Sequence, residues 1–466
     1  MTAINDMQKR QSAPWYLIVR RKFRSLLNNP RRLNANYVVP KLSGQQLSTL
    51  ANLKVIPTFG TASSLMSGQR WEELANYIDA HEHPLMRVVA GYLRSNDAVS
   101  GSKAKTTQRL IHAIEKAPFI DKMSMPELLS ASNVLTQFGF FKVSAVFQYA
   151  AIAKELGKEK SNGVNRRAAK ITLRAADWDD LENLLAEVKA PYHEILKAEK
   201  KAIQQQGLKL LEALKTNSVI DAQRKKESLP ADAYQSTISL RNREMNLAGS
   251  NILLAGPSVR KSQSVSFDWP DKVLRIGFRG ADSVASDHEM PTNISFYKDH
   301  KLSDLTEEEI NLLAAELDCF VVSGLKTETV RAVRSLPNVF YSRFSGRILF
   351  NAECNAGLEA LLCIIDAGAQ KVHIKNVDLL ISNVYPHGYK SNNYEKRTSV
   401  VGWGLDEEIV CRSMALGHSP LAQYSLFKYF WNENRLSGDH FFQQLMNEGL
   451  LAYLERLEST YHPFRQ

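Results

Sequence analysis

Short apolar runs alternate with amphipathic segments along the second half of the chain. The apolar runs predict buried strands at residues 251–255, 273–276, 293–297, 319–322, 339–341 and 372–377. Residues 307–317 and 358–365 place their apolar side chains at helical spacing, so these two segments predict helices. Because strands that alternate with helices form parallel sheets covered on both faces, we expect a Rossmann-like, mainly parallel α/β fold.

The first half of the chain has helical periodicity almost throughout. It predicts helices at residues 126–138, 141–156, 166–176, 178–188 and 192–214, with an earlier helix opening at Trp71. The connections between them are short, and several contain glycine or proline. This pattern favours an all-α array of helical hairpins similar to tetratricopeptide repeats, although the sequence has no regular repeat period.

Changes in composition divide the chain into four regions. Residues 1–70 are basic, and residues 71–225 form the helical-hairpin region. Residues 226–250 are polar and contain few large apolar side chains, which is typical of a linker. The alternating pattern then occupies residues 251–466, which we expect to fold as the α/β domain.

The positive charge of the protein is concentrated at its N-terminus. The formal net charge is +10, and residues 1–70 contain eleven basic residues and one acid, so the rest of the chain is neutral. Residues 15–27 predict an amphipathic helix whose polar side carries Arg20, Arg21, Lys22 and Arg24. Such a helix is typical of a segment that lies on an anionic membrane surface. One alternative is that this segment docks on the protein itself. Another is that it binds nucleic acid, but we expect no nucleic-acid partner because the sequence contains no RNA- or DNA-reading motif.

The remaining composition indicates a cytoplasmic protein. Cys319, Cys354, Cys363 and Cys411 lack the spacing of a zinc site or a redox motif, so we expect reduced thiols. The sequence has no apolar run long enough to cross a membrane and no secretory leader. We therefore expect a cytoplasmic protein lying on the inner membrane, with no metal and no bound cofactor.

The stretch of residues 349–380 carries the main chemical signal. It predicts a loop, a helix and a buried strand, and the helix is preceded by the small residues Asn355, Ala356 and Gly357. Unpaired amides and the helix dipole make such a helix N-terminus a favourable site for phosphate. Asp378 follows the strand, where open α/β sheets bind their ligands. Phosphate donors and a carboxylate are thus expected close together.

Other predicted strands also end in small or polar residues. Gly256, Pro257 and Ser258 follow the first strand, Gly277 follows the second, and Ser323 follows the fourth. These turns match neither the dinucleotide-binding glycine pattern nor a P-loop, and a tight turn without a ligand is the alternative for each.

The segment from Asp177 to Asp179 has the D-x-D spacing of metal-dependent sugar transferases. It opens a predicted helix, however, and acids are favoured at the cap and in the first turn of a helix. We therefore interpret it as a helix cap.

Residues 251–430 resemble the sialyltransferase-like fold of bacterial transferases that use CMP-activated sugar acids. LLAGPS resembles the first nucleotide motif of that group, and LRIGFRG follows it, with Gly277 where the group has asparagine. FNAECNAGLEALLCIIDAGAQKVHIKNVDLL resembles the second motif, and GHSPL resembles the late histidine motif. The capsule and lipopolysaccharide β-Kdo transferases are the most similar members.

The resemblance implies roles for particular residues. Asp378 would be the nucleophile of a retaining reaction, and His418 would stabilise the CMP phosphate or move a proton. The residues implied in nucleotide binding are Gly256, Pro257, Ser258, Gly277, Ser323, Asn355, Ala356 and Gly357. The candidates to bind the donor carboxylate are Arg279, Lys298 and Arg343, and the candidates for an acceptor loop are Tyr385, His387 and Tyr389.

We therefore expect a metal-independent glycosyltransferase that moves a sugar acid, most simply Kdo, from a CMP donor to a cell-surface glycan or glycolipid. The helical region would bind the acceptor or a protein partner. The alternatives are a transferase that uses CMP-sialic acid or a UDP or GDP sugar, and a non-catalytic helical scaffold with a degenerate nucleotide-binding domain. The sequence leaves open whether the reaction retains or inverts configuration.

Overall fold

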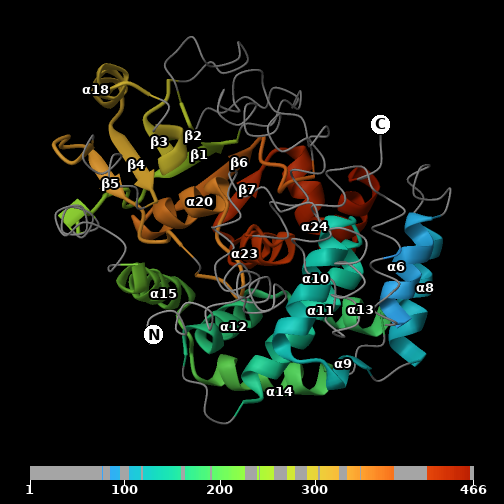
Figure 1. The fold of residues 1–466 in the computed structure, drawn as a ribbon. Coiled ribbons are helices and arrows are strands. Elements are labelled where there is room, and N and C mark those ends of the chain that lie inside the picture. The colour runs from blue at the N-terminus through green and yellow to red at the C-terminus, as the bar shows by residue number, and fades with distance from the viewer. Residues whose placement is uncertain are drawn as a thin grey trace, which may run out of the picture.

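The described strands form one seven-stranded parallel sheet at the centre of the C-terminal half of the protein (Figure 1). The structure is a computed structural model that describes residues 84–94, 104–116, 119–158, 163–188, 192–225, 239–240, 242–256, 270–278, 291–302, 305–324, 333–346, 348–381 and 417–461, together with residue 76. The strands are β1 (Asn251–Ala255), β2 (Lys272–Ile276), β3 (Ile294–Lys298), β4 (Cys319–Ser323), β5 (Val339–Tyr341), β6 (Lys371–Lys375) and β7 (Leu436–Gly438). All six neighbouring pairs are parallel, which confirms the expected Rossmann-like sheet.

The strand order determines where along the carboxyl edge of the sheet a ligand is expected to bind. The order is β5-β4-β3-β2-β1-β6-β7, so the chain moves outward from β1 to β5 and then returns to place β6 on the other side of β1. The connecting helix is α20 (Ala356–Asp366). In an open parallel sheet, ligands bind where the direction of winding reverses, which here is the junction of β1 and β6.

Alternating side chains give the sheet two buried faces. Ile294 and Phe296 of β3 belong to the core beneath α20, whereas Tyr297 belongs to a second core on the opposite face. That second core is covered by α17 (Asp299–Leu302) and α18 (Glu307–Glu316). Both faces are therefore covered, as the apolar strands require.

The regular elements described before β1 are all helices. They are α6 (Pro84–Leu93), α8 (Ala104–Lys116), α9 (Phe119–Lys122), α10 (Met125–Gln137), α11 (Phe141–Leu156), α12 (Val164–Ala175), α13 (Trp178–Glu187), α14 (His193–Gln205) and α15 (Leu210–Lys225). The single helix predicted for residues 192–214 is wrong. It is divided at Gly207, whose φ of +62° lies in the left-handed region and ends α14.

The C-terminal helices join the helical part to the sheet. α23 (Pro420–Asn432) packs on α12 and α20, and α24 (His440–Thr460) packs on α11 and α13, so one continuous apolar core includes both parts. The described end of the predicted linker is also docked, because the amide of Leu247 donates to the carbonyl of Ala367 at 2.8 Å. No helix among the described residues has the length and apolarity needed to cross a membrane, and the predicted N-terminal amphipathic helix lies outside those residues.

Candidate functional site

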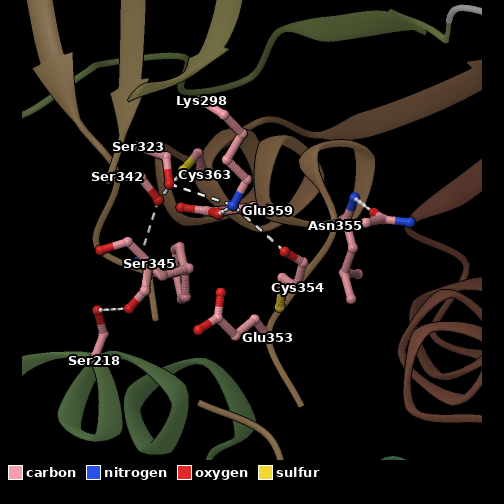
Figure 2. Close-up of polar contacts among 12 residues, drawn as sticks. Ser218, Lys298, Ser323, Ser342, Ser345, Glu353, Cys354, Asn355, Glu359 and Cys363 are labelled. Carbon is pink, nitrogen blue, oxygen red and sulfur yellow. Dashed lines mark hydrogen bonds and ion pairs between the residues drawn. The ribbon is translucent and has the colours of Figure 1, made fainter. Parts of the chain in front are cut away.

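A buried ion pair lies at the carboxyl ends of β3 and β4 (Figure 2). The ammonium of Lys298, the last residue of β3, contacts the Oε2 atom of Glu359 on α20. It also lies 3.4 Å from the hydroxyl of Ser323 and 3.4 Å from the carbonyl of Cys354. An ammonium has three N–H groups, and these three acceptors match them in number. The hydrogen-bond donors of Lys298 are therefore used by groups of the protein itself.

The surroundings of this pair are strongly polar although they are buried. Glu359 is 1% exposed, and its second oxygen, Oε1, accepts no hydrogen bond from the described residues. Burial lowers the pKa of Lys298, but the nearby carboxylates of Glu359 and Glu353 raise it by more, so its pKa lies above the ordinary value. Lys298 therefore carries its positive charge at neutral pH.

His418 lies beside this pair and has a defined tautomer. Its Nδ1 atom is 3.3 Å from the carbonyl oxygen of Glu353, and because a carbonyl only accepts, Nδ1 carries the hydrogen. Burial lowers the pKa of His418, and the positive charge of Lys298 lowers it further. The ring is thus neutral at pH 7, with a lone pair on Nε2 that can accept a proton.

The N-terminus of α20 completes this cluster. The side chain of Asn355 caps the helix, since its Oδ1 atom accepts from the amide of Leu358 at 2.8 Å. A Cβ atom on Gly357 would lie 3.6 Å from the side chain of Ile276, so the helix begins beside the end of β2. Ala356 and Gly357 are the first two residues of α20, and the amides at this position of a helix have no acceptor within the helix, so they are available as hydrogen-bond donors to a phosphate.

A second group of residues meets where β1 and β6 end. The amide of Gly256 donates to the carbonyl of Lys375 at 2.8 Å. A Cβ atom on Gly256 would lie only 2.3 Å from the carbonyl oxygen of Asn376, so a larger residue would push the two strand ends apart. The glycine is required here by this close approach.

Asp378 lies in a strained turn after β6. Asn376, Leu379 and Leu380 have φ values of 56°, 49° and 73°, which cost a non-glycine residue of order 1–3 kcal/mol each. Asp378 is 7% exposed, and its Oδ1 atom accepts from the amide of Leu380 at 3.1 Å. Backbone strain of this kind concentrates at functional sites.

The predicted site residues thus fall into two groups along one edge of the sheet. Lys298, Ser323, His418 and the N-terminus of α20 form the first, and Gly256 and Asp378 form the second. The second group lies at the end of β6, which is three strand spacings, or about 14 Å, from β3 and two spacings, or about 10 Å, from β2. These distances separate the two groups along the edge of the sheet. Gly277, at the end of β2 with φ +67°, lies between the groups.

Arg343 is not brought to this edge. Its guanidinium pairs with Glu244 at 3.5 Å and with Asp366 at 3.8 Å, near the C-terminal end of α20. Asp366 follows Glu359 by about two helical turns, or roughly 10 Å. Arg343 therefore lies away from the Lys298 pair.

Several predictions have a direct structural outcome, and others fall outside the described residues. The side chain of Asp177 accepts from the amide of Asp180 at 3.5 Å, which confirms that the D-x-D segment caps α13. Cys319, Cys354 and Cys363 are reduced. The predicted residues outside the described part are Arg20, Arg21, Lys22, Arg24, Pro257, Ser258, Arg279, Tyr385, His387, Tyr389 and Cys411.

Sequence reasoning missed Glu359, although the sequence contained a signal for it. Glu359 is the single charged residue among the first ten residues of an otherwise apolar helix. A carboxylate in such a helix is buried with the apolar face and needs a cationic partner, which the polar strand end at Lys298 provides.

Comparisons of the chain with protein-family models, with curated proteins and with solved structures found no match in any of the three.

Proposed function

We propose that the protein is a glycosyltransferase that moves a sugar acid, most simply Kdo, from a CMP donor to a surface glycan. The observation that carries this proposal is the line of polar groups along the carboxyl edge of the parallel sheet. The N-terminus of α20 and Asp378 lie on this line, separated by about the spacing of two strands.

The proposed reaction assigns a task to each end of this line. The phosphate of the donor binds the amides of Ala356 and Gly357, and the sugar extends toward β6. There the carboxylate of Asp378 forms a bond to the anomeric carbon as the bond to the phosphate breaks, and the acceptor hydroxyl then displaces the carboxylate. His418 lies in the first group, at the phosphate end of this line, and, once protonated, donates to the leaving phosphate.

The helical part would bind the acceptor or a protein partner. α10 and α11 pack closely as a hairpin joined at Gly139, whose φ is +75°, and this supports an array of the tetratricopeptide type. The basic N-terminal segment would hold the enzyme on the cytoplasmic face of the inner membrane. A chain that lacks residues 1–40 should then pellet less with anionic vesicles than the full chain, and equal pelleting would contradict the membrane contact.

The nucleotide is tested by thermal unfolding of the full chain with CMP, CDP, UDP, GDP and ATP. A ligand at a hundred times its Kd stabilises the fold by about 2.7 kcal/mol, which is readily seen as a rise in Tm. A rise with CMP supports the proposal and leads to transfer assays with CMP-Kdo and CMP-sialic acid. A rise with UDP or GDP alone contradicts the CMP donor, and no rise with any nucleotide favours the scaffold alternative.

The nucleophile is tested by Asp378→Ala in the transfer assay. We expect kcat to fall by about 10⁴-fold, because a reaction that forms a covalent intermediate cannot proceed without its nucleophile. The matched control is Asp318→Ala, which removes an exposed acid that pairs with Lys272 at the opposite edge of the sheet. Transfer by the Asp378 variant at the rate of this control would refute the assigned mechanism.

A further inference from the structure

The last helix in the described part of the chain, α24, is divided into two halves by a kink. Gly449, inside α24, has φ 88° and ψ 177°, so the helix stops and restarts at Leu450. The restarted half needs an acceptor for its first amide, as any helix N-terminus does. That acceptor comes from the helical part of the protein, because the Oδ2 atom of Asp180 on α13 accepts from the amide of Leu450 at 2.8 Å.

The fit between Asp180 and the kink is close. A Cβ atom on Gly449 would lie 2.5 Å from the Oδ1 atom of Asp180, so the carboxylate fills the space that a side chain would need. A second contact from the helical part secures the same half of α24, since Lys142 on α11 pairs with Glu455 at 2.7 Å. The amide of Lys142 also donates to Glu458 at 2.9 Å.

The same half-helix, together with its C-cap residue Tyr461, also holds the turn that contains Asp378. The hydroxyl of Tyr453 donates to the carbonyl of Leu379 at 2.8 Å, and the hydroxyl of Tyr461 donates to the carbonyl of Leu380. Both tyrosines are completely buried. Burial raises the pKa of Tyr453 well above its ordinary value, and the nearby charge of Asp378 raises it further, so the hydroxyl remains a donor.

The two carbonyls that receive these hydroxyls belong to the two left-handed leucines of the turn. Strained backbone persists only where the surrounding structure fixes it. We propose that the second half of α24 is a positioning element, which the helical part holds at Asp180 and Gly449 and which in turn fixes the turn that carries Asp378. The helical part therefore controls the placement of Asp378 from a distance.

The role assigned to Asp378 rests on the proposed function, but the coupling itself can be measured without any activity. The reporters are the amides of Leu380 and Ile381, which donate to the Oδ1 atom and the carbonyl of Asp378. Their hydrogen exchange is measured by NMR or mass spectrometry on the full chain. The remote variant is Asp180→Ala, and Tyr453→Phe and Tyr461→Phe act directly at the turn.

We expect exchange at Leu380 and Ile381 to become about tenfold faster in each of these three variants, because each leaves a buried amide or carbonyl without its partner. Exchange in β3 should not change. Asp180→Asn keeps a side-chain oxygen that can accept from the amide of Leu450, so exchange at Leu380 and Ile381 should remain as slow as in the parent protein. The matched control is Tyr192→Phe, which removes a buried hydroxyl that donates to the carbonyl of Ile120 at 3.1 Å within the helical part and should have no effect at the turn.

Unchanged exchange at the turn in Asp180→Ala, or an equal acceleration in β3, would overturn the proposal. If Asp180→Ala yields no soluble protein, Asp180→Ser is interpreted in the same way. Where transfer activity is found, the same variants should lower kcat about tenfold and leave the KM of the donor unchanged. Accelerated exchange in a protein without transfer activity would support the coupling and count against the proposed function alone.

Discussion

The ion pair of Lys298 and Glu359 determines the electrostatics of the first group of site residues. Removing one member of a buried pair leaves the other charge without compensation, whereas removing both by apolar residues of similar size is often tolerated. We predict that Lys298→Met lowers the free energy of unfolding by about 3 kcal/mol, and that Lys298→Met with Glu359→Leu restores most of it. Urea denaturation measures both, and a single variant as stable as the parent would contradict the buried pair.

The same substitution has a second consequence, for the titration of His418. Because the charge of Lys298 lowers the pKa of His418, Lys298→Met should raise it, which NMR titration of the imidazole would detect. A histidine whose pKa is lower in the folded protein supplies stability above its ordinary pKa of about 6.5, and this stability is lost as the pH falls below that value. The loss on acidification should therefore be smaller in the variant.

His373 provides an internal control for this titration. Burial lowers its pKa to about 4, and the charges that act on it are Asp439, Lys371 and Lys375, not Lys298. Its titration should be unchanged in Lys298→Met. An equal shift of both histidines would indicate a general rearrangement instead of a direct effect of the missing ammonium.

At the scale of elements, the sequence predicted most of the sheet because its strands are buried on both faces. Such strands appear as uninterrupted apolar runs bounded by polar residues, and β1 and β5 begin and end at the predicted residues. β7 and α24 were missed. β7 is only three residues long, and its sequence, LSG, has no apolar run.

The apolar pattern of the sequence placed at the sheet edge only those site residues that directly follow a predicted strand. Lys298, Ser323 and Asp378 follow apolar runs, so their positions at one edge of a parallel sheet could be inferred. Which of them lie together depends on the strand order, and the insertion of β6 beside β1 cannot be deduced from local patterns. The hydroxyls that hold the turn of Asp378 come from Tyr453 of α24 and from Tyr461, which follows that helix, more than seventy residues further along the chain.

At the scale of the whole molecule, the helical part and the sheet depend on each other. α15 reaches the loop after β5, where Asn217 donates to the carbonyl of Ile348 at 3.2 Å and Ser218 donates to that of Ser345 at 2.8 Å. On the other side, the hydroxyl of Ser419 donates to Gln148 of α11 at 2.8 Å. The apolar core continues through α23 and α24 between these contacts.

This shared core predicts that the two parts unfold together. Far-UV circular dichroism reports mainly on the helices and near-UV circular dichroism on the packed aromatic residues, and the two thermal transitions should coincide. Lys142→Ala removes the ion pair of α11 with Glu455 and keeps the backbone amide that donates to Glu458. It should lower both midpoints by the same small amount, since about 1 kcal/mol is lost from one cooperative unit. Asp318→Ala, at an exposed strand end, should change neither midpoint. Two separate transitions, of which Lys142→Ala shifts only one, would mean that the helical part and the sheet are independent folding units and that α24 joins them only weakly.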